Sequence, residues 1–135
     1  VLKYGERPGA KGLYFMDAWA FMTIFLGFAA AGSSLNIFQL GGTGVQAMIK
    51  SPMSSSHGVV TPLMWSTGNP STYATAGPEN IDFCSGPVYE GKETVEEAGE
   101  RLLTTILEIA SGRLTCAETL RHIDPVEPNL EAPFF

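Results

Sequence analysis

A glycine-rich stretch that directly follows an apolar segment is the part of this chain best suited to ligand chemistry. Gly41, Gly42, Thr43 and Gly44 come after residues 34–39, which read as a short buried strand. Glycine lets backbone N–H groups approach a ligand closely. In parallel α/β sheets, ligands bind beyond the carboxyl ends of the strands. We therefore expect these four residues to bind an anionic group. A Gly-Gly hairpin turn is the alternative.

The same stretch does not match the nucleotide-binding motifs. It lacks the third glycine of the dinucleotide fingerprint, and the chain has no Gly-Lys-Ser or Gly-Lys-Thr sequence of the phosphate-binding loop. A nucleotide is therefore not the expected ligand.

Polar side chains gather where a second predicted strand meets a helix. Ser66, Thr67 and Asn69 stand between the strand predicted over residues 59–65 and a helix that begins at Pro70. Their hydroxyl and amide groups could bind a hydroxyl or carboxylate of a sugar acid. Helix N-capping is the alternative, and it alone accounts for Asn69.

Two titratable residues are further candidates. His57 lies in a long predicted loop over residues 45–58, where an imidazole could transfer a proton near neutral pH. A solvated loop histidine is the alternative. Asp82 lies in a nearly apolar segment, so its carboxylate either faces a ligand or belongs to a turn.

The elements that must position these residues alternate along the chain. Apolar periodicity, with glycine and proline as punctuation, predicts strands at residues 13–16, 34–39, 59–65 and 81–83, and helices at 18–31, 70–76, 95–110 and 116–122. This order is typical of an α/β fold with a mainly parallel sheet and helices on both faces, Rossmann-like in arrangement.

Two helix starts have a strong local signature. Thr94 with Glu97, and Thr115 with Glu118, have the three-residue spacing of a capping box. Each pair predicts that a helix begins at the residue after the threonine.

Composition excludes some classes of partner. The chain has 135 residues and a net charge of −6, with only 8 Lys and Arg, so no basic face for nucleic acid is expected. The apolar run over residues 19–31 is shorter than the roughly 20 residues that span a bilayer, so no membrane partner is expected. Cys84 and Cys116 are isolated, as in proteins of a reducing compartment, and we expect a cytoplasmic protein. Residues 1–123 form one predicted domain, followed by a loosely held tail at 124–135.

Several phrases in a fixed order resemble the C-terminal part of the altronate and galactarate dehydratase family of sugar-acid hydro-lyases, which also includes sulfolactate sulfo-lyase-like members. The phrases are residues 1–6, 12–18, 27–32, Ser66-Thr67-Gly68-Asn69-Pro70, 80–83, 96–100 and 110–112.

The resemblance implies elimination of water from a sugar acid to give a 2-keto-3-deoxy acid. It also implies a divalent metal, iron(II), that stabilises the developing enediolate. Members are longer than this chain, so the resemblance implies upstream domains of the same protein or a separate subunit, as well as a homo-oligomer. A fragment of this length is not expected to turn over alone.

This chain departs from the family at the expected substrate site. The family usually has Thr-Thr-Gly-Arg-Gly where residues 39–44 stand, and asparagine where Cys84 stands. The missing arginine would be a natural carboxylate clamp. Three functions remain open: a sugar-acid dehydratase, a carbon–sulfur lyase that uses His57 and the altered loop, and a non-catalytic folding or assembly domain.

Overall fold

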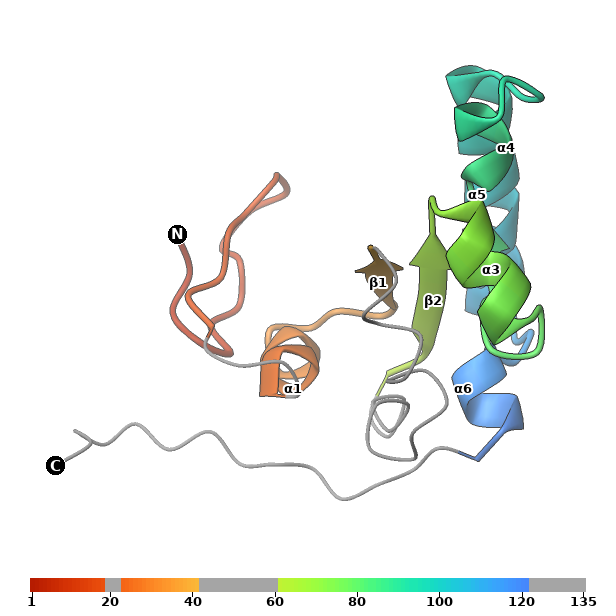
Figure 1. Ribbon diagram of the computed structural model, residues 1–135. Coiled ribbons are helices and arrows are strands. Elements are labelled where there is room, and N and C mark those ends of the chain that lie inside the picture. The colour runs from red at the N-terminus through yellow and green to blue at the C-terminus, as the bar shows by residue number, and fades with distance from the viewer. Residues whose placement is uncertain (19–22, 42–60, 122–135) are drawn as a thin grey trace, which may run out of the picture.

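A parallel sheet forms the centre of the computed structural model, which describes residues 1–18, 23–41 and 61–121. Within those residues the strands are β1 (Asn36–Leu40), β2 (Leu63–Thr67) and β3 (Phe83–Cys84), in that spatial order and all parallel (Figure 1). The predicted α/β class with a parallel sheet is confirmed. The finer Rossmann-like arrangement stays a prediction.

The central strand β2 is buried along its whole length. It pairs with β1 on one side and β3 on the other, with Leu40 opposite Thr67 and Ser66 opposite Phe83. A parallel strand covered on both faces needs a nearly continuous apolar sequence, and Leu63 and Met64 are fully buried.

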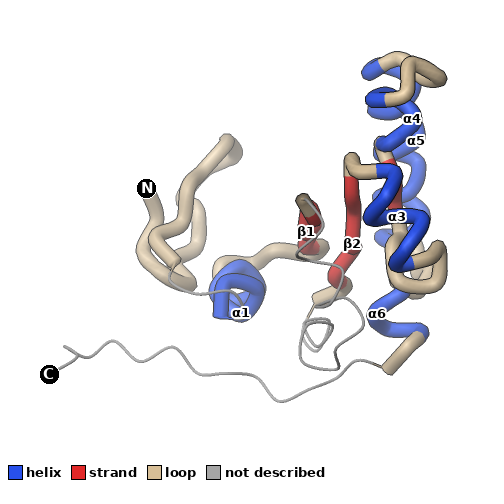
Figure 2. Tube along the Cα trace, in the orientation of Figure 1, coloured by secondary structure: helices blue, strands red, loops and turns tan. Residues whose placement is uncertain are grey.

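Helices cover both faces of this sheet, as the sequence predicts. Their bounds are α1 (Thr23–Ala30), α3 (Pro70–Ala76), α4 (Gly86–Tyr89), α5 (Val95–Ala110) and α6 (Cys116–Thr119). On one face, Trp65 packs in a cluster with Phe25 of α1, and Phe38 contacts both rings edge to face. On the other face, Met64 packs with Ile109 of α5. Successive strand side chains point to opposite faces, so neighbouring residues of β2 anchor the two layers. Figure 2 shows β1 and β2 in red between the helices α1 and α3.

Local capping signals place the helix starts. The Thr94 hydroxyl accepts the Glu97 N–H, and the Glu97 carboxylate accepts the Thr94 N–H, so the predicted capping box is present. Thr115 and Glu118 form the same box at α6. A capping side chain stabilises a helix by about 1 kcal/mol.

The helix predicted over residues 18–31 is described as α1 from Thr23 onward. It ends in a Schellman motif, with Gly32 at φ +97° and the Ser33 N–H bonded to the Phe28 carbonyl. Glycine adopts this left-handed backbone without the steric cost that a β-carbon brings.

Several elements differ from the predictions. β2 extends two residues beyond the predicted end at 65, so Ser66 and Thr67 belong to the strand, and β3 is Phe83–Cys84 rather than residues 81–83. Residues 13–16 do not form a strand, because only Met16 is bridged, to Leu2, while Leu13 and Phe15 are exposed. The short helix α4 was not predicted, since its Gly-Pro start reads as a turn. The last helix, α6, ends at Thr119 rather than near residue 122. None of the helices in the described ranges combines the length and apolar character that crossing a membrane requires.

Candidate active site

The carboxyl ends of the strands bring the predicted binding residues to one edge of the sheet. Gly41 directly follows β1, and Ser66 and Thr67 are the last residues of β2. Because Leu40 is opposite Thr67 in the register, Gly41 lies beside the segment from Thr67 to Asn69. Parallel pairing therefore brings Gly41 close to Ser66, Thr67 and Asn69, as the sequence predicted.

The Thr67 hydroxyl ties the two strand ends together. Its Oγ1 donates to the Leu40 carbonyl at 3.1 Å and accepts the Asn69 N–H at 3.2 Å. The Thr67 side chain is fully buried. The Thr67 side chain therefore holds the two strand ends together and does not itself face a ligand.

Asn69 and Gly41 are held by the start of α3. The Asn69 side chain accepts the N–H groups of Ser71 and Thr72, which is the capping role that its position predicts. The Thr72 hydroxyl lies 3.3 Å from the Gly41 carbonyl and donates to it. Gly41 is exposed, and among the described residues a β-carbon there would meet nothing within 4 Å. No packing contact within that part of the chain requires a glycine at this position, so the backbone of Gly41 is accessible from that side.

Ser66 faces the other layer of the molecule. Its Oγ lies 2.6 Å from Gln39 Oε1 and 3.3 Å from the Phe38 carbonyl, and the residue is buried. The exposed side chain at this point is Gln39, which stands where the family pattern begins. Ser66 therefore orients Gln39 and can reach a ligand only through it.

Asp82 has a structural role in this fold. One carboxylate oxygen accepts the Trp65 N–H and the other accepts the Cys116 N–H, both at 2.8 Å. These bonds join β2 to the start of α6. Burial, followed by the nearby Asp82 carboxylate, raises the pKa of the Cys116 thiol to about 12. Both cysteines are free thiols.

The remaining predicted site residues lie outside the described ranges. These are Gly42, Thr43, Gly44 and His57. Binding by the glycine stretch and proton transfer by His57 stay predictions.

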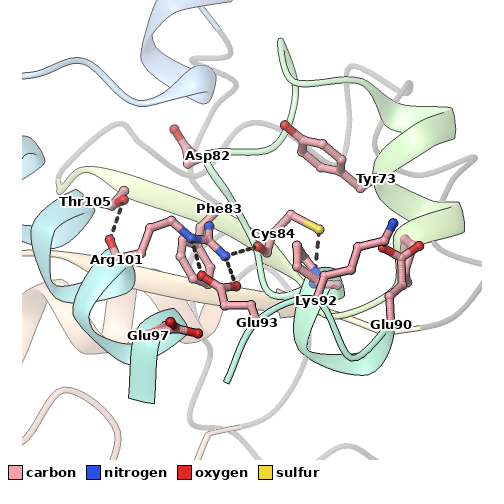
Figure 3. Close-up of a pocket in the computed structure, with 13 residues that line it drawn as sticks. Tyr73, Asp82, Phe83, Cys84, Glu90, Lys92, Glu93, Glu97, Arg101 and Thr105 are labelled. Atoms are coloured by element: carbon pink, nitrogen blue, oxygen red, sulfur yellow. Dashed lines mark hydrogen bonds and ion pairs between the residues drawn. The ribbon is translucent and has the colours of Figure 1, made fainter. Parts of the chain in front are cut away.

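An open groove of about 900 Å³ lies beside β3. Pro70 at the start of α3, Cys84 at the end of β3 and Gly86 at the start of α4 line one end. Charged side chains line the rest, among them Lys92, Glu93 and Arg101 (Figure 3). Among the predicted site residues that the structure describes, Asp82 lines this groove, whereas Gly41, Ser66, Thr67 and Asn69 do not.

Arg101 makes three hydrogen bonds at one end of its side chain, more than the other cation in the groove lining, Lys92. Its Nε lies 2.9 Å from Glu93 Oε1, and its Nη2 lies 2.6 Å from Glu93 Oε2 and 2.9 Å from the Cys84 carbonyl. The guanidinium stacks 4.5 Å from the centre of the Phe83 ring. The hydrogen bonds from Arg101 lower the pKa of Glu93, and the same contacts raise the pKa of Arg101.

Sequence reasoning missed this ion pair. The carboxylates from Glu93 to Glu100 read as a solvated helix face, and helical spacing favours Glu97 as the partner of Arg101. In the structure the Glu97 carboxylate is occupied by the capping box. Glu93, which precedes α5, forms the ion pair with Arg101 instead.

The described residues do not form a metal centre. Among them, no group of three His, Cys, Asp or Glu side chains converges closely enough to hold an ion. The donors present, such as Asp82 and Glu97, are occupied by backbone N–H groups. The structure therefore assigns no ligand to the iron(II) that the resemblance implies.

Comparison with known proteins shows the family to which this chain belongs. The family model described as "D-galactarate/Altronate dehydratase, C-terminal" matches residues 1–129. The chain belongs to this family. A relative within the D-galactarate/altronate dehydratase family is the (2R)-sulfolactate sulfo-lyase subunit beta of Chromohalobacter salexigens, which is 34% identical over 125 residues. That match covers 90% of this chain and 29% of the relative, so the chain spans under a third of the relative's length. The family resemblance predicted from the sequence is confirmed, and with it a relationship to lyases.

Proposed function

We propose that this chain is the C-terminal portion of a hydro-lyase that dehydrates a sugar acid of the altronate or galactarate type. The reaction removes the proton next to the carboxylate, expels the hydroxyl group from the neighbouring carbon and yields a 2-keto-3-deoxy acid. The observation that carries the proposal is that Gly41 and the segment from Thr67 to Asn69 share the carboxyl edge of a parallel sheet.

The proposed roles combine that placement with the sequence predictions for residues 42–44 and His57. Backbone N–H groups of residues 41–44 bind the substrate carboxylate, since an anion can be held by amides even in an acidic protein. Thr67 and Asn69 fix the edge, and Ser66 orients Gln39 toward the substrate. His57 exchanges the proton with the substrate. This role suits an imidazole, which titrates near neutral pH.

The metal and the partner domains are part of the same proposal. A divalent metal, iron(II), supplies Lewis-acid stabilisation of developing negative charge when bound. Its ligands are proposed to come from beyond the described residues, from upstream domains of the same protein or from another subunit of a homo-oligomer. A cytoplasmic location is also proposed, because isolated cysteines are typical of proteins in a reducing compartment.

A carbon–sulfur lyase is the second candidate, and the 34% identical sulfo-lyase subunit favours it. In that reaction the same proton is removed next to the carboxylate, but sulfite leaves from the neighbouring carbon. The chemistry at the carboxylate is shared, so the anion-binding edge serves either leaving group.

One experiment separates these functions. Full-length protein is incubated with iron(II) and a panel of hexarates, hexonates and sulfolactate. Formation of a keto-deoxy acid selects dehydration, and release of sulfite selects the sulfo-lyase reaction. No product across the panel contradicts both and leaves the non-catalytic alternative.

A further inference from the structure

The outer face of α5 carries an apolar ridge that the core does not use. Val95, Gly99, Leu103 and Leu107 follow one another at four-residue spacing and form one row on the helix. The three large side chains are 69%, 56% and 57% exposed. We call these four residues the α5 ridge.

The sheet is covered by a different face of the helix. Ala98, Thr105 and Ile109 are the buried residues of α5. A surface helix normally presents charged and polar residues on its outer side. Exposed apolar side chains in a continuous row on a charged helix indicate a contact surface.

A mostly apolar groove of about 360 Å³ lies beside the N-terminal half of the α5 ridge, at Val95 and Gly99. Ile37 of β1 lies on its opposite wall and is 45% exposed, while Val95, Gly99 and Leu102 form the helix wall. A β-carbon at Gly99 would meet nothing within 4 Å. Because Gly99 has no side chain that projects from the helix, another backbone can approach α5 closely at this point.

The shape of this surface fits a helix. Rows at four-residue spacing pack into the grooves of a second helix in the commonest class of helix–helix contact. The α5 ridge supplies such a row, and the neighbouring groove receives the side chains of the incoming helix.

The charges beside the α5 ridge indicate the charge of the partner that binds there. Glu96 and Glu100 are exposed next to it, and within the described part of the chain neither forms an ion pair. In a two-fold contact, a second copy would bring the same two carboxylates to this face. Like charges at an interface oppose association. The missing partner is therefore basic where this face is acidic.

We propose that the α5 ridge and its groove dock an amphipathic helix with an apolar face and a basic flank, contributed by a different polypeptide segment. This contact lies on the α5 side of the sheet, where Gln39 and Ser66 also line the groove. The ridge residues Leu103 and Leu107 lie outside that lining, so changing them alters association while leaving the anion-binding edge intact.

The probe is a labelled synthetic amphipathic peptide with leucines along one face and lysines beside them. Its matched control has glutamates in place of the lysines. Fluorescence anisotropy with the full chain is expected to show saturable binding of the lysine peptide and at least roughly tenfold weaker binding of the glutamate peptide, a difference of about 1.4 kcal/mol.

Variants locate the contact. Leu103→Gln and Leu107→Gln are expected to weaken binding of the lysine peptide about tenfold, as truncation of a central apolar anchor does. Leu114→Gln changes an equally exposed leucine outside the ridge and leaves binding unchanged. Glu100→Lys reverses the preference between the two peptides. Circular dichroism confirms that each variant is folded.

Three outcomes overturn the proposal. The first is equal binding of the two peptides. The second is an undiminished affinity in the folded Leu103→Gln and Leu107→Gln variants. The third is a dimer of the wild-type chain that Leu103→Gln dissociates in sedimentation velocity, because a second copy is then the occupant.

Discussion

Glu93 and Arg101 form a two-pronged ion pair, with the guanidinium stacked on the Phe83 ring and bonded to the Cys84 carbonyl. Cys84 is the last residue of the short strand β3. Arg101 therefore links α5 to the carboxyl end of β3, and it lines the 900 Å³ groove there.

The first prediction concerns the pH dependence of this ion pair. Arg101 lowers the pKa of Glu93 in the folded chain below the roughly 4.3 of an unfolded glutamate. A lowered folded-state pKa stabilises the fold above the unfolded pKa, and that stabilisation is lost as the pH falls through the folded pKa. We expect Glu93→Gln to remove this contribution, so that urea unfolding of the variant depends less on pH below about 5 than that of the wild type.

The exposed Lys92–Glu90 pair supplies the control for that measurement. Glu90→Gln should alter the acid limb of the stability curve little, because exposed ion pairs contribute little to stability. Identical acid limbs in wild type and Glu93→Gln would contradict the role given to the pair.

The second prediction concerns the hydroxyl that joins the strand ends. Thr67→Val keeps the shape of the side chain but removes the partner of the Leu40 carbonyl and the Asn69 N–H. Leaving buried polar groups unpaired costs about 1–3 kcal/mol, and we expect a decrease of that size in the free energy of unfolding. Thr75→Val is the matched control, since its exposed hydroxyl bonds only within α3. Equal stability of the two variants would show that Thr67 does not hold the edge.

The third prediction concerns Asp82 and the reactivity of a thiol. Burial and the Asp82 carboxylate raise the pKa of Cys116 to about 12. Asp82→Asn removes the negative charge, so the pKa of Cys116 should fall and its alkylation by iodoacetamide at alkaline pH should become faster. Mass spectrometry distinguishes Cys116 from Cys84, and the Cys84 rate serves as an internal reference. An unchanged Cys116 rate in a folded variant would count against the electrostatic contribution of Asp82.

These predictions show which features can be read from the sequence. The capping boxes at Thr94 and Thr115 depend only on residues three positions apart, so they were predicted correctly. The placement of Gly41 beside the Thr67 segment follows from parallel topology alone, since Leu40 is opposite Thr67. Residues 13–16 have a strand-like sequence, but a strand needs a neighbour, and the only bridge there joins Met16 to Leu2.

The details of the site depend on three-dimensional competition for partners. Nothing local indicates that Glu97 is taken by a backbone N–H and leaves Arg101 to Glu93. In the same way, Asp82 reaches a backbone N–H that is 34 residues away. Hydrogen bonds of this kind are fixed by packing, so the sequence identified the edge but not the groove beside it.

The fourth prediction concerns the proposed base. We expect His57→Ala to lower turnover at least about tenfold without unfolding the domain, because a general acid or base typically contributes more than that to the rate. Steady-state kinetics with the substrate found in the panel measures this. A wild-type kcat would remove His57 from the mechanism.

The measurement that tests the account most directly is the kcat/KM of Gly41→Val. The site of the new side chain is open, so the fold should tolerate it, while the side chain would obstruct the amides that are proposed to bind the substrate carboxylate. Gly9→Val, at an equally open glycine far along the chain, is the control. The account predicts that kcat/KM falls about tenfold, or about 1.4 kcal/mol, for Gly41→Val alone, with unchanged thermal stability in both variants. A folded Gly41→Val enzyme with the wild-type kcat/KM would contradict it.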